Sequence, residues 1–199
     1  MMNTIITHPE NKAVTDIVFV KTIPGLGVFE LRPIDLEADI PLLHNWVNRE
    51  YAVYWGMNGF SVQEVYDSYC KILEKTDVYM GIFNGAVSFL LECYNPEEDS
   101  IGDYYPVEKG DRGMHILVAP FEKSISNFTW SVFTVILDFI FCDAQNKRVV
   151  VEPDARNHKI HLLNKKAGFV FQTLLDLPHK KAHLEFCTRE EYYKALQSI

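Results

Sequence analysis

The chain has 199 residues, of which 48% are hydrophobic and 23% are charged, and its formal net charge is −8. This apolar content excludes a largely disordered protein, and the length fits one globular domain. The negative charge would repel a phosphate backbone, so we expect no nucleic-acid partner. We expect a single domain over residues 27–199, preceded by an N-terminal extension or edge strand over residues 1–26.

No segment predicts a membrane span, because the longest apolar helical stretch, residues 128–142, is interrupted by polar side chains. The N-terminus lacks the basic-then-apolar order of a signal peptide, so we expect a cytoplasmic protein. Four cysteines stand singly, without the short spacings of zinc or redox sites: Cys70, Cys93, Cys142 and Cys187. We expect reduced core thiols and no metal.

The first elements are a strand, two helices and a hairpin. Alternating residues predict a strand over 28–32, and apolar residues at helical spacing predict a helix from about Asp35. Ser61 is a suitable N-cap for a second helix. Asn84-Gly85 separates two apolar runs, 78–83 and 86–91, and this dipeptide is the strongest short-range hairpin signal.

Strands and helices then alternate. They are expected at residues 113–118 (strand), 126–142 (helix), 148–151 (strand), 157–166 (helix), 169–175 and 182–187 (strands), and from Arg189 (helix). This order favours an α/β or α+β fold with a mixed sheet.

Polar residues follow directly after the buried strand 148–151, beginning with Glu152-Pro153-Asp154. Strand ends that open into helices are where α/β proteins place ligands. Pro153 fixes the turn and so aims the side chain of Asp154. From the residues alone, a catalytic role for Asp154 and a role as the N-cap of the helix near Asn157 stay equally open.

His115 lies in the middle of the apolar strand 113–118. Burial penalises a charged imidazole, so this side chain must be neutral or hydrogen-bonded. Both a functional histidine and a satisfied core histidine fit this position.

Three segments carry a family resemblance: GDRGMHILVAP (110–120), RVVVEPDARNHKIHLLNKKAGF (148–169) and LPHKKAHLEF (177–186). They resemble the siderophore-biosynthesis acyltransferases of the GNAT superfamily of acyl-coenzyme A N-acyltransferases. The likeness extends over nearly all of Gly27 to Arg189, and EPD-x-RN-x-K is its most specific part.

The resemblance implies a GNAT fold, in which helices flank a mixed sheet that splays between its two central parallel strands. It implies acetyl- or succinyl-coenzyme A as co-substrate and His115 and Asp154 as the catalytic pair. A backbone N–H of Leu117 or Val118 would bind the thioester carbonyl.

Two departures from the family pattern affect the expected site. The loop 121–129 has no glycine, so the following helix N-terminus would hold the diphosphate. Asn164 stands where many GNAT enzymes have a tyrosine acid, which leaves His115 to return the proton to sulfur. The expected coenzyme A contacts are Leu117, Val118, Ser126, Asn127, Thr129, Asn157 and Asn164.

The expected acceptor is an N-hydroxylated diamine of the N-hydroxyputrescine or N-hydroxycadaverine type, which acylation converts to a hydroxamate. Trp46, Trp55 and Glu152 are expected on the acceptor side, although isolated tryptophans also suit a plain core. A GNAT enzyme for ordinary amines or polyamines and a non-catalytic acyl-coenzyme A-binding module stay as alternatives. A siderophore synthetase is an expected partner.

Overall fold

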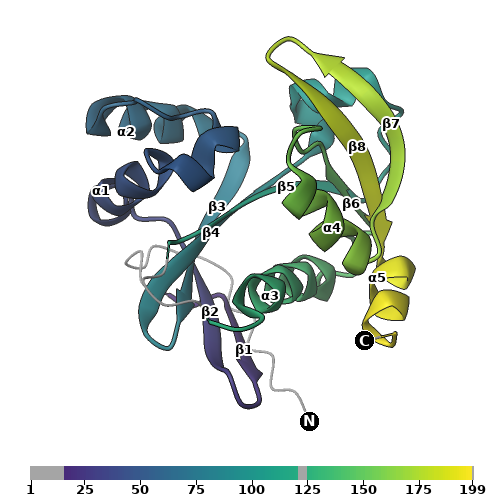
Figure 1. Ribbon diagram of the computed structural model, residues 1–199, viewed down its shortest axis with the longest axis horizontal. Helices are drawn as coiled ribbons and strands as arrows, with labels where there is room; N and C mark the ends of the chain where they lie inside the picture. Colours follow the sequence, from purple (N-terminus) through teal and green to yellow (C-terminus); the bar gives the residue numbers. More distant parts are fainter. Residues whose placement is uncertain (1–15, 121–124, 199) are drawn as a thin grey trace. The chain divides into compact units, whose positions relative to one another are not determined.

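The computed structural model describes residues 16–120 and 125–198 of the chain. The described residues form an eight-stranded sheet in the order β1-β2-β3-β4-β5-β6-β8-β7 (Figure 1). The strands are β1 (Phe19–Ile23), β2 (Gly27–Pro33), β3 (Thr76–Phe83), β4 (Ala86–Tyr94), β5 (Asp111–Val118), β6 (Arg148–Val151), β7 (Val170–Leu177) and β8 (Lys180–Thr188). β5 and β6 run parallel, whereas β6–β8 and β7–β8 are antiparallel. The predicted mixed sheet is therefore confirmed.

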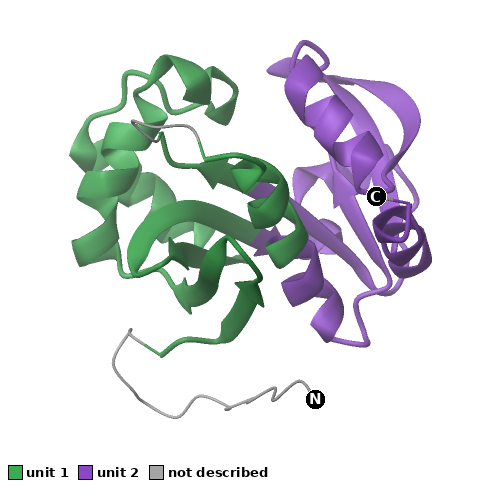
Figure 2. Ribbon diagram, turned by 60° about the horizontal axis from the view of Figure 1, so that its bottom comes forward, with its two compact units in different colours: residues 1–92, 116–135 green, residues 93–115, 136–199 purple. Residues whose placement is uncertain are grey.

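The described chain falls into two compact units (Figure 2). Unit 1 comprises residues 1–92 and 116–135, and unit 2 comprises residues 93–115 and 136–199. The α-helices are α1 (Leu36–Val47), α2 (Val62–Ile72), α3 (Phe128–Cys142), α4 (His158–Lys166) and α5 (Arg189–Leu196), and the 3-10 helices are η1 (Glu50–Trp55), η2 (Pro96–Glu98) and η3 (Ser100–Tyr104).

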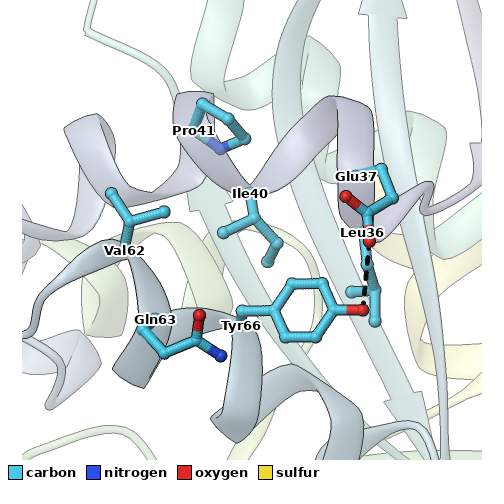
Figure 3. A pocket seen from close by; sticks show the side chains of 7 residues that line it. All are labelled: Leu36, Glu37, Ile40, Pro41, Val62, Gln63 and Tyr66. Atoms are coloured by element: carbon cyan, nitrogen blue, oxygen red, sulfur yellow. Dashed lines mark hydrogen bonds between the residues drawn. The ribbon is translucent and has the colours of Figure 1, made fainter.

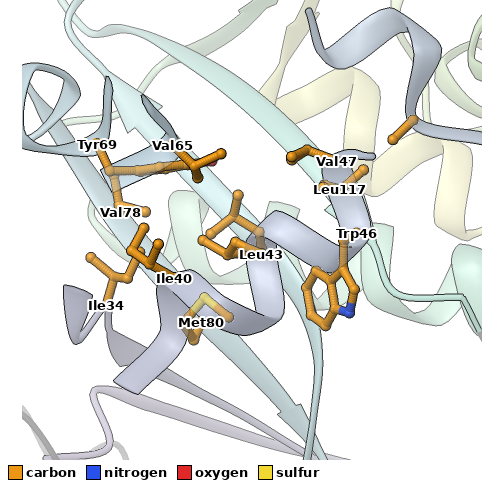
Figure 4. Close-up of a cluster of buried hydrophobic side chains, with 12 residues drawn as sticks. Ile34, Ile40, Leu43, Trp46, Val47, Val65, Tyr69, Val78, Met80 and Leu117 are labelled. Carbon is orange, nitrogen blue, oxygen red and sulfur yellow. The ribbon is translucent and has the colours of Figure 1, made fainter. Parts of the chain in front are cut away.

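Local capping explains where the helices of unit 1 begin. The Asp35 carboxylate accepts hydrogen bonds from the first-turn N–H groups of α1. Ser61 and Glu64 form a capping box at the start of α2. One hydrophobic core cluster of the unit packs against α1 and α2 and includes Leu43, Trp46 and Met80 (Figure 4).

The predicted hairpin is the connection between β3 and β4. Asn84 has φ +48° and Gly85 has φ +83°, which is the left-handed pair that a type I′ turn requires. The Asn84 side chain also accepts a hydrogen bond from the backbone N–H of Val28, between Oδ1 and N at 2.9 Å. This short turn therefore helps to fix β2 beside the hairpin.

In unit 2, the long β7–β8 hairpin pairs with β6 through β8 (Figure 1). The carboxamide of Asn157 accepts the Ile160 N–H and starts α4, and Gly168 with φ +97° follows its end. Thr188 and Glu191 form a second capping box at α5. Local sequence signals thus determine the helix ends in both units.

Only part of the predicted N-terminal extension, residues 1–26, lies within the described residues. Residues 1–15 lie outside them, and β1 pairs antiparallel with β2 at the edge of the sheet. The single domain over residues 27–199 stays a prediction. Within residues 16–120 and 125–198, no helix has the length and apolarity needed to cross a membrane.

Candidate active site

The parallel strands β5 and β6 pair only over the first three residues of β5. Asp111–Gly113 of β5 pair with Arg148–Val150 of β6, and β5 then continues to Val118. His115 lies two residues beyond the last paired position of β5. His115 therefore lies where β5 no longer pairs with β6, and its side chain is 39% exposed.

The segment after β6 stays attached to β8. Asp154 forms a β-bridge with Ala182, in the register of the β6–β8 pairing. The backbone N–H of His183 donates to the carbonyl of Pro153, with N and O 3.0 Å apart. Because successive side chains alternate between faces, Glu152 and Asp154 share one face, while His183 and Glu185 lie on the other.

The first face carries a buried carboxylate with three partners, which we name the Glu152 cluster: Tyr94, His115, Glu152 and Lys180. Oε1 of Glu152 lies 3.1 Å from Nε2 of His115 and 3.4 Å from Nζ of Lys180. The Tyr94 hydroxyl donates to Oε2 at 3.1 Å. Burial alone would raise the pKa of Glu152, but the charge and hydrogen bond of His115, with Lys180 and Tyr94, hold this pKa at about 2.

This geometry fixes the orientation of the His115 ring. An ionised carboxylate only accepts hydrogen bonds, so Nε2 of His115 carries the proton that faces Glu152. The Tyr94 ring lies against the imidazole, with centroids 5.0 Å apart. In neutral His115, Nδ1 is then the nitrogen that can take up a proton.

Asp154 is held by its neighbour Arg156. Its carboxylate accepts from the backbone N–H of Arg156 at 2.8 Å, from Nε at 2.9 Å and from Nη2 at 2.7 Å. The side-chain hydrogen bonds of Arg156 hold the pKa of Asp154 at about 2, against the effect of burial. The N-cap of α4 is Asn157, so the capping alternative for Asp154 is wrong.

The opposite face carries a second buried carboxylate, which we name the Glu185 cluster: His161, Asn164, His183 and Glu185. Oε1 of Glu185 lies 2.8 Å from Nδ1 of His161 and 3.6 Å from Nδ1 of His183. Nδ2 of Asn164 donates to Oε2 of Glu185 at 2.7 Å. Asn164, expected to contact coenzyme A, is only 1% exposed and belongs to this cluster.

Residues 35–177 match the family model of the acetyltransferase (GNAT) domain. The chain belongs to this family. The predicted GNAT fold and the predicted acyltransferase class are thereby confirmed at the level of the domain family.

Two curated relatives and one solved structure are informative. The chain is 30% identical over 170 residues to hydroxyornithine transacylase SID3 of Ajellomyces capsulatus, covering 80% of this chain and 37% of that protein. It is 25% identical over 169 residues to N-hydroxyputrescine acetyltransferase of Acinetobacter baumannii, covering 83% of this chain and 80% of that protein. The crystal structure of an uncharacterized protein from Bacillus halodurans superposes with a TM-score of 0.84 at 26% identity, covering 90% and 94% of the two chains.

These relatives confirm the predicted resemblance to acyltransferases of N-hydroxylated amines, since both curated names denote such enzymes. This chain spans just over a third of the fungal relative, so it corresponds to one part of that longer protein.

Asn157, also expected to contact coenzyme A, is the N-cap of α4 in unit 2, and the remaining predicted site residues lie in unit 1. Trp46 is 3% exposed and belongs to the core, the alternative that the sequence left open, whereas Trp55 is half-buried against the same cluster. Leu117 is buried and Val118 half-buried on β5, and three polar side chains are exposed around the start of α3: Ser126, Asn127 and Thr129. The loop residues 121–124 lie outside the described part of the chain.

Sequence reasoning missed Tyr94 and Lys180. Lys180 lies in the segment 177–186 that carried the resemblance, but it had no assigned role. Tyr94 ends β4 and gave no local signal. Both were missed because their importance lies in a contact with Glu152, which the chain order does not reveal.

Unit 1 also has a hollow of about 250 Å³ between α1 and α2 (Figure 3). In it the Tyr66 hydroxyl donates to Oε1 of Glu37 at 3.2 Å. Its lining residues are Leu36, Glu37, Ile40, Pro41, Val62, Gln63 and Tyr66. None of them was predicted as a site residue.

Proposed function

We propose that this chain transfers an acyl group from acyl-coenzyme A to the hydroxylamine nitrogen of an N-hydroxylated diamine, giving a hydroxamate for siderophore biosynthesis. The observation that carries the proposal is the similarity to N-hydroxyputrescine acetyltransferase, which extends over four-fifths of both chains. A cytoplasmic location, where acyl-coenzyme A is available, and a siderophore synthetase as partner belong to the same proposal.

His115 is the proposed general base. The hydroxylamine nitrogen is largely neutral at pH 7, so it attacks the thioester carbonyl carbon and forms the C–N bond without losing a proton first. Nδ1 of His115 then takes the proton from nitrogen, the C–S bond breaks, and the same proton passes to the leaving thiolate. The ionised Glu152 supports this role because it orients the ring and stabilises the imidazolium that forms.

Asp154 is the proposed second member of the pair, with a different task. A carboxylate whose pKa is about 2 is a weak base at neutral pH. Arg156 fixes both of its oxygens, and each oxygen still has acceptor capacity. We assign Asp154 to accept a hydrogen bond from the substrate hydroxyl group.

The proposed coenzyme A site uses the end of β5 and the start of α3. The N–H of Ala119 donates to the carbonyl of Ser88 on β4, with N and O 2.8 Å apart. Since successive N–H groups of an extended strand point to opposite sides, that of Val118 points away from β4. This favours Val118 over Leu117 as the donor to the thioester oxygen.

The diphosphate is assigned to the exposed side chains of Ser126, Asn127 and Thr129, where the first N–H groups of α3 add partial positive charge. The Asn157 side chain already accepts a hydrogen bond as the N-cap of α4, so a contact with coenzyme A would come in addition to that bond.

On the acceptor side, Trp55 is more exposed than Trp46 and is therefore the tryptophan assigned to the substrate. Glu152 acts through His115 in this proposal.

A thiol-release assay tests the proposal. Acetyl- and succinyl-coenzyme A are crossed with N-hydroxyputrescine, N-hydroxycadaverine, N-hydroxylysine and the parent diamines, and hydroxamate is detected by its ferric complex. We expect turnover with at least one N-hydroxy diamine and much slower turnover with its parent amine. Turnover with parent amines alone would reject the hydroxamate proposal and retain an acyltransferase, and absence of thiol release with every pair would support a binding module.

A further inference from the structure

We propose that His161, His183 and Glu185 form a binding site for a divalent transition-metal ion, represented here by Zn²⁺. One ligand atom from each of the three residues lies within 4.8 Å of the other two. Oε1 of Glu185 lies between the two rings, 2.8 Å from Nδ1 of His161 and 3.6 Å from Nδ1 of His183. The ligand atoms therefore converge before any ion is added.

The charge of the cluster favours a cation. Glu185 is 5% exposed, and its partners among the described residues are two imidazoles and one carboxamide. None of these groups is permanently positive, and a buried carboxylate is costly unless a positive charge compensates it. A divalent ion would supply that charge at the point where the ligand atoms meet.

The other hydrogen bonds of His161 and Glu185 are of the kind that metal-binding residues make. Nε2 of His161 lies 3.1 Å from the carbonyl oxygen of Asp154, so this nitrogen carries a proton and Nδ1 is directed at the cluster. Nδ2 of Asn164 donates to Oε2 of Glu185 and leaves Oε1 toward the imidazoles. Metal-bound histidines typically donate their second N–H to a carbonyl or carboxylate, and metal-bound carboxylates are hydrogen-bonded in turn.

The residue types select the class of ion. Imidazole nitrogen suits zinc, copper, iron and nickel, whereas calcium and magnesium prefer oxygen ligands. Two histidines and one glutamate with a further open position also form a known zinc coordination pattern. The imidazoles of His161 and His183 are stacked, with ring centroids 4.1 Å apart. Two positive charges at this distance would repel each other, whereas two uncharged rings can both bind one ion.

The site is separate from the proposed acyl-transfer residues. Glu185 and His183 lie on the face of the β6–β8 pair opposite to Glu152 and Asp154. Metal binding can therefore be tested whether or not the proposed function holds. The His161 bond to the Asp154 carbonyl also connects a bound ion to the backbone that carries Asp154.

The test is a titration of the full, metal-stripped chain with Zn²⁺ by calorimetry, repeated with Co²⁺ by absorption spectroscopy. We expect one equivalent to bind and the melting temperature to rise by about 5 °C or more near saturation. His183→Leu and Glu185→Gln should each weaken binding by at least tenfold. His179→Leu, a change in the exposed turn of the same hairpin, should leave binding unchanged.

Circular dichroism of each variant checks the fold, and Glu185→Gln provides a near-isosteric test if His183→Leu fails to fold. The Co²⁺ spectrum should lack a thiolate charge-transfer band, because no cysteine belongs to the site. The prediction of four core thiols is wrong for Cys70 and Cys142, which are exposed, whereas Cys93 and Cys187 are buried. Binding that neither variant weakens, a thiolate band from Cys70 or Cys142, or no stoichiometric binding would each overturn the proposal.

Discussion

Glu152, directly after β6, and Glu185, on β8, are both buried carboxylates, and each contacts histidine, but their remaining partners differ. Glu152 contacts the ammonium group of Lys180, together with Tyr94 and His115. Glu185 contacts two histidines and the carboxamide of Asn164. Glu152 thus has a lysine ammonium group among its partners, whereas the described partners of Glu185 include no lysine or arginine.

The difference indicates what each cluster can do. The charge and hydrogen bond of His115, with Lys180 and Tyr94, hold the pKa of Glu152 at about 2, so a proton gained by His115 is stabilised without being passed to the carboxylate. The Glu185 cluster has no lysine or arginine among its described partners, which suits a site for an added cation.

The largest expected effect is on catalysis at the Glu152 cluster. His115→Ala should lower turnover with the preferred N-hydroxy diamine by at least ~100-fold, the usual size of a general-base effect. His179→Ala changes an exposed histidine and should retain wild-type turnover. Steady-state kinetics of both variants, with circular dichroism for the fold, make the measurement, and near-wild-type turnover in His115→Ala would remove this residue from the mechanism.

Asp154→Asn should also lower turnover by about 100-fold, because a neutral amide is a weaker acceptor for the substrate hydroxyl group. The amide oxygen can still accept from the Arg156 backbone N–H, so the turn should persist. Asp176→Asn, an exposed aspartate paired with Lys181, is the matched control. Equal rates in the two variants would argue against a role for Asp154.

Acid should destabilise the protein through Glu152. Its folded-state pKa, about 2, lies below the ordinary value of 4.5, so its stabilising contribution is complete above pH ~4.5 and is lost as the pH falls through 2. The shift corresponds to roughly 3 kcal/mol of unfolding free energy. Urea unfolding of the wild type and of Glu152→Gln between pH 6 and pH 2.5 separates this loss from that of Asp154, whose pKa is also about 2. An equal fall in free energy in the two proteins would contradict the assignment.

Removing the Glu152 charge should leave Lys180 without its partner. Breaking a buried ion pair costs about 3–5 kcal/mol, and partial solvation of Lys180 reduces this to an expected ~2–3 kcal/mol for Glu152→Gln. The double variant Glu152→Gln/Lys180→Met should recover at least half of that loss. Urea unfolding at pH 7 gives both values, and additive losses in the double variant would show that the pair is not coupled.

The smallest effect is expected for Glu185→Gln in the metal-free protein. The amide oxygen can accept from Asn164, and the amide NH₂ can donate to Nδ1 of His161, so every hydrogen bond has a neutral replacement. We expect a change below ~1 kcal/mol in unfolding free energy. A loss as large as that of Glu152→Gln would mean that the two carboxylates are compensated in the same way.

The sequence by itself determined the elements whose causes are local. Asn84-Gly85 specified a hairpin because both residues tolerate positive φ, and Ser61 specified the start of α2 through a bond within one helical turn. The EPD-x-RN-x-K run and the His115 strand likewise identified the family before any contact was known. Each of these signals depends only on residues that are close together in the sequence.

The tertiary structure alone decided the partners of the buried charges. The parallel register pairs Gly113 with Val150, which brings His115 opposite Glu152, a residue that we expected from the sequence on the acceptor side. In the same way, α4 and β8 bring His161 to His183 and Glu185, residues without a metal-site spacing in the chain. Strand register and helix packing are set by the whole sheet and core, so no local pattern encodes which distant side chains meet.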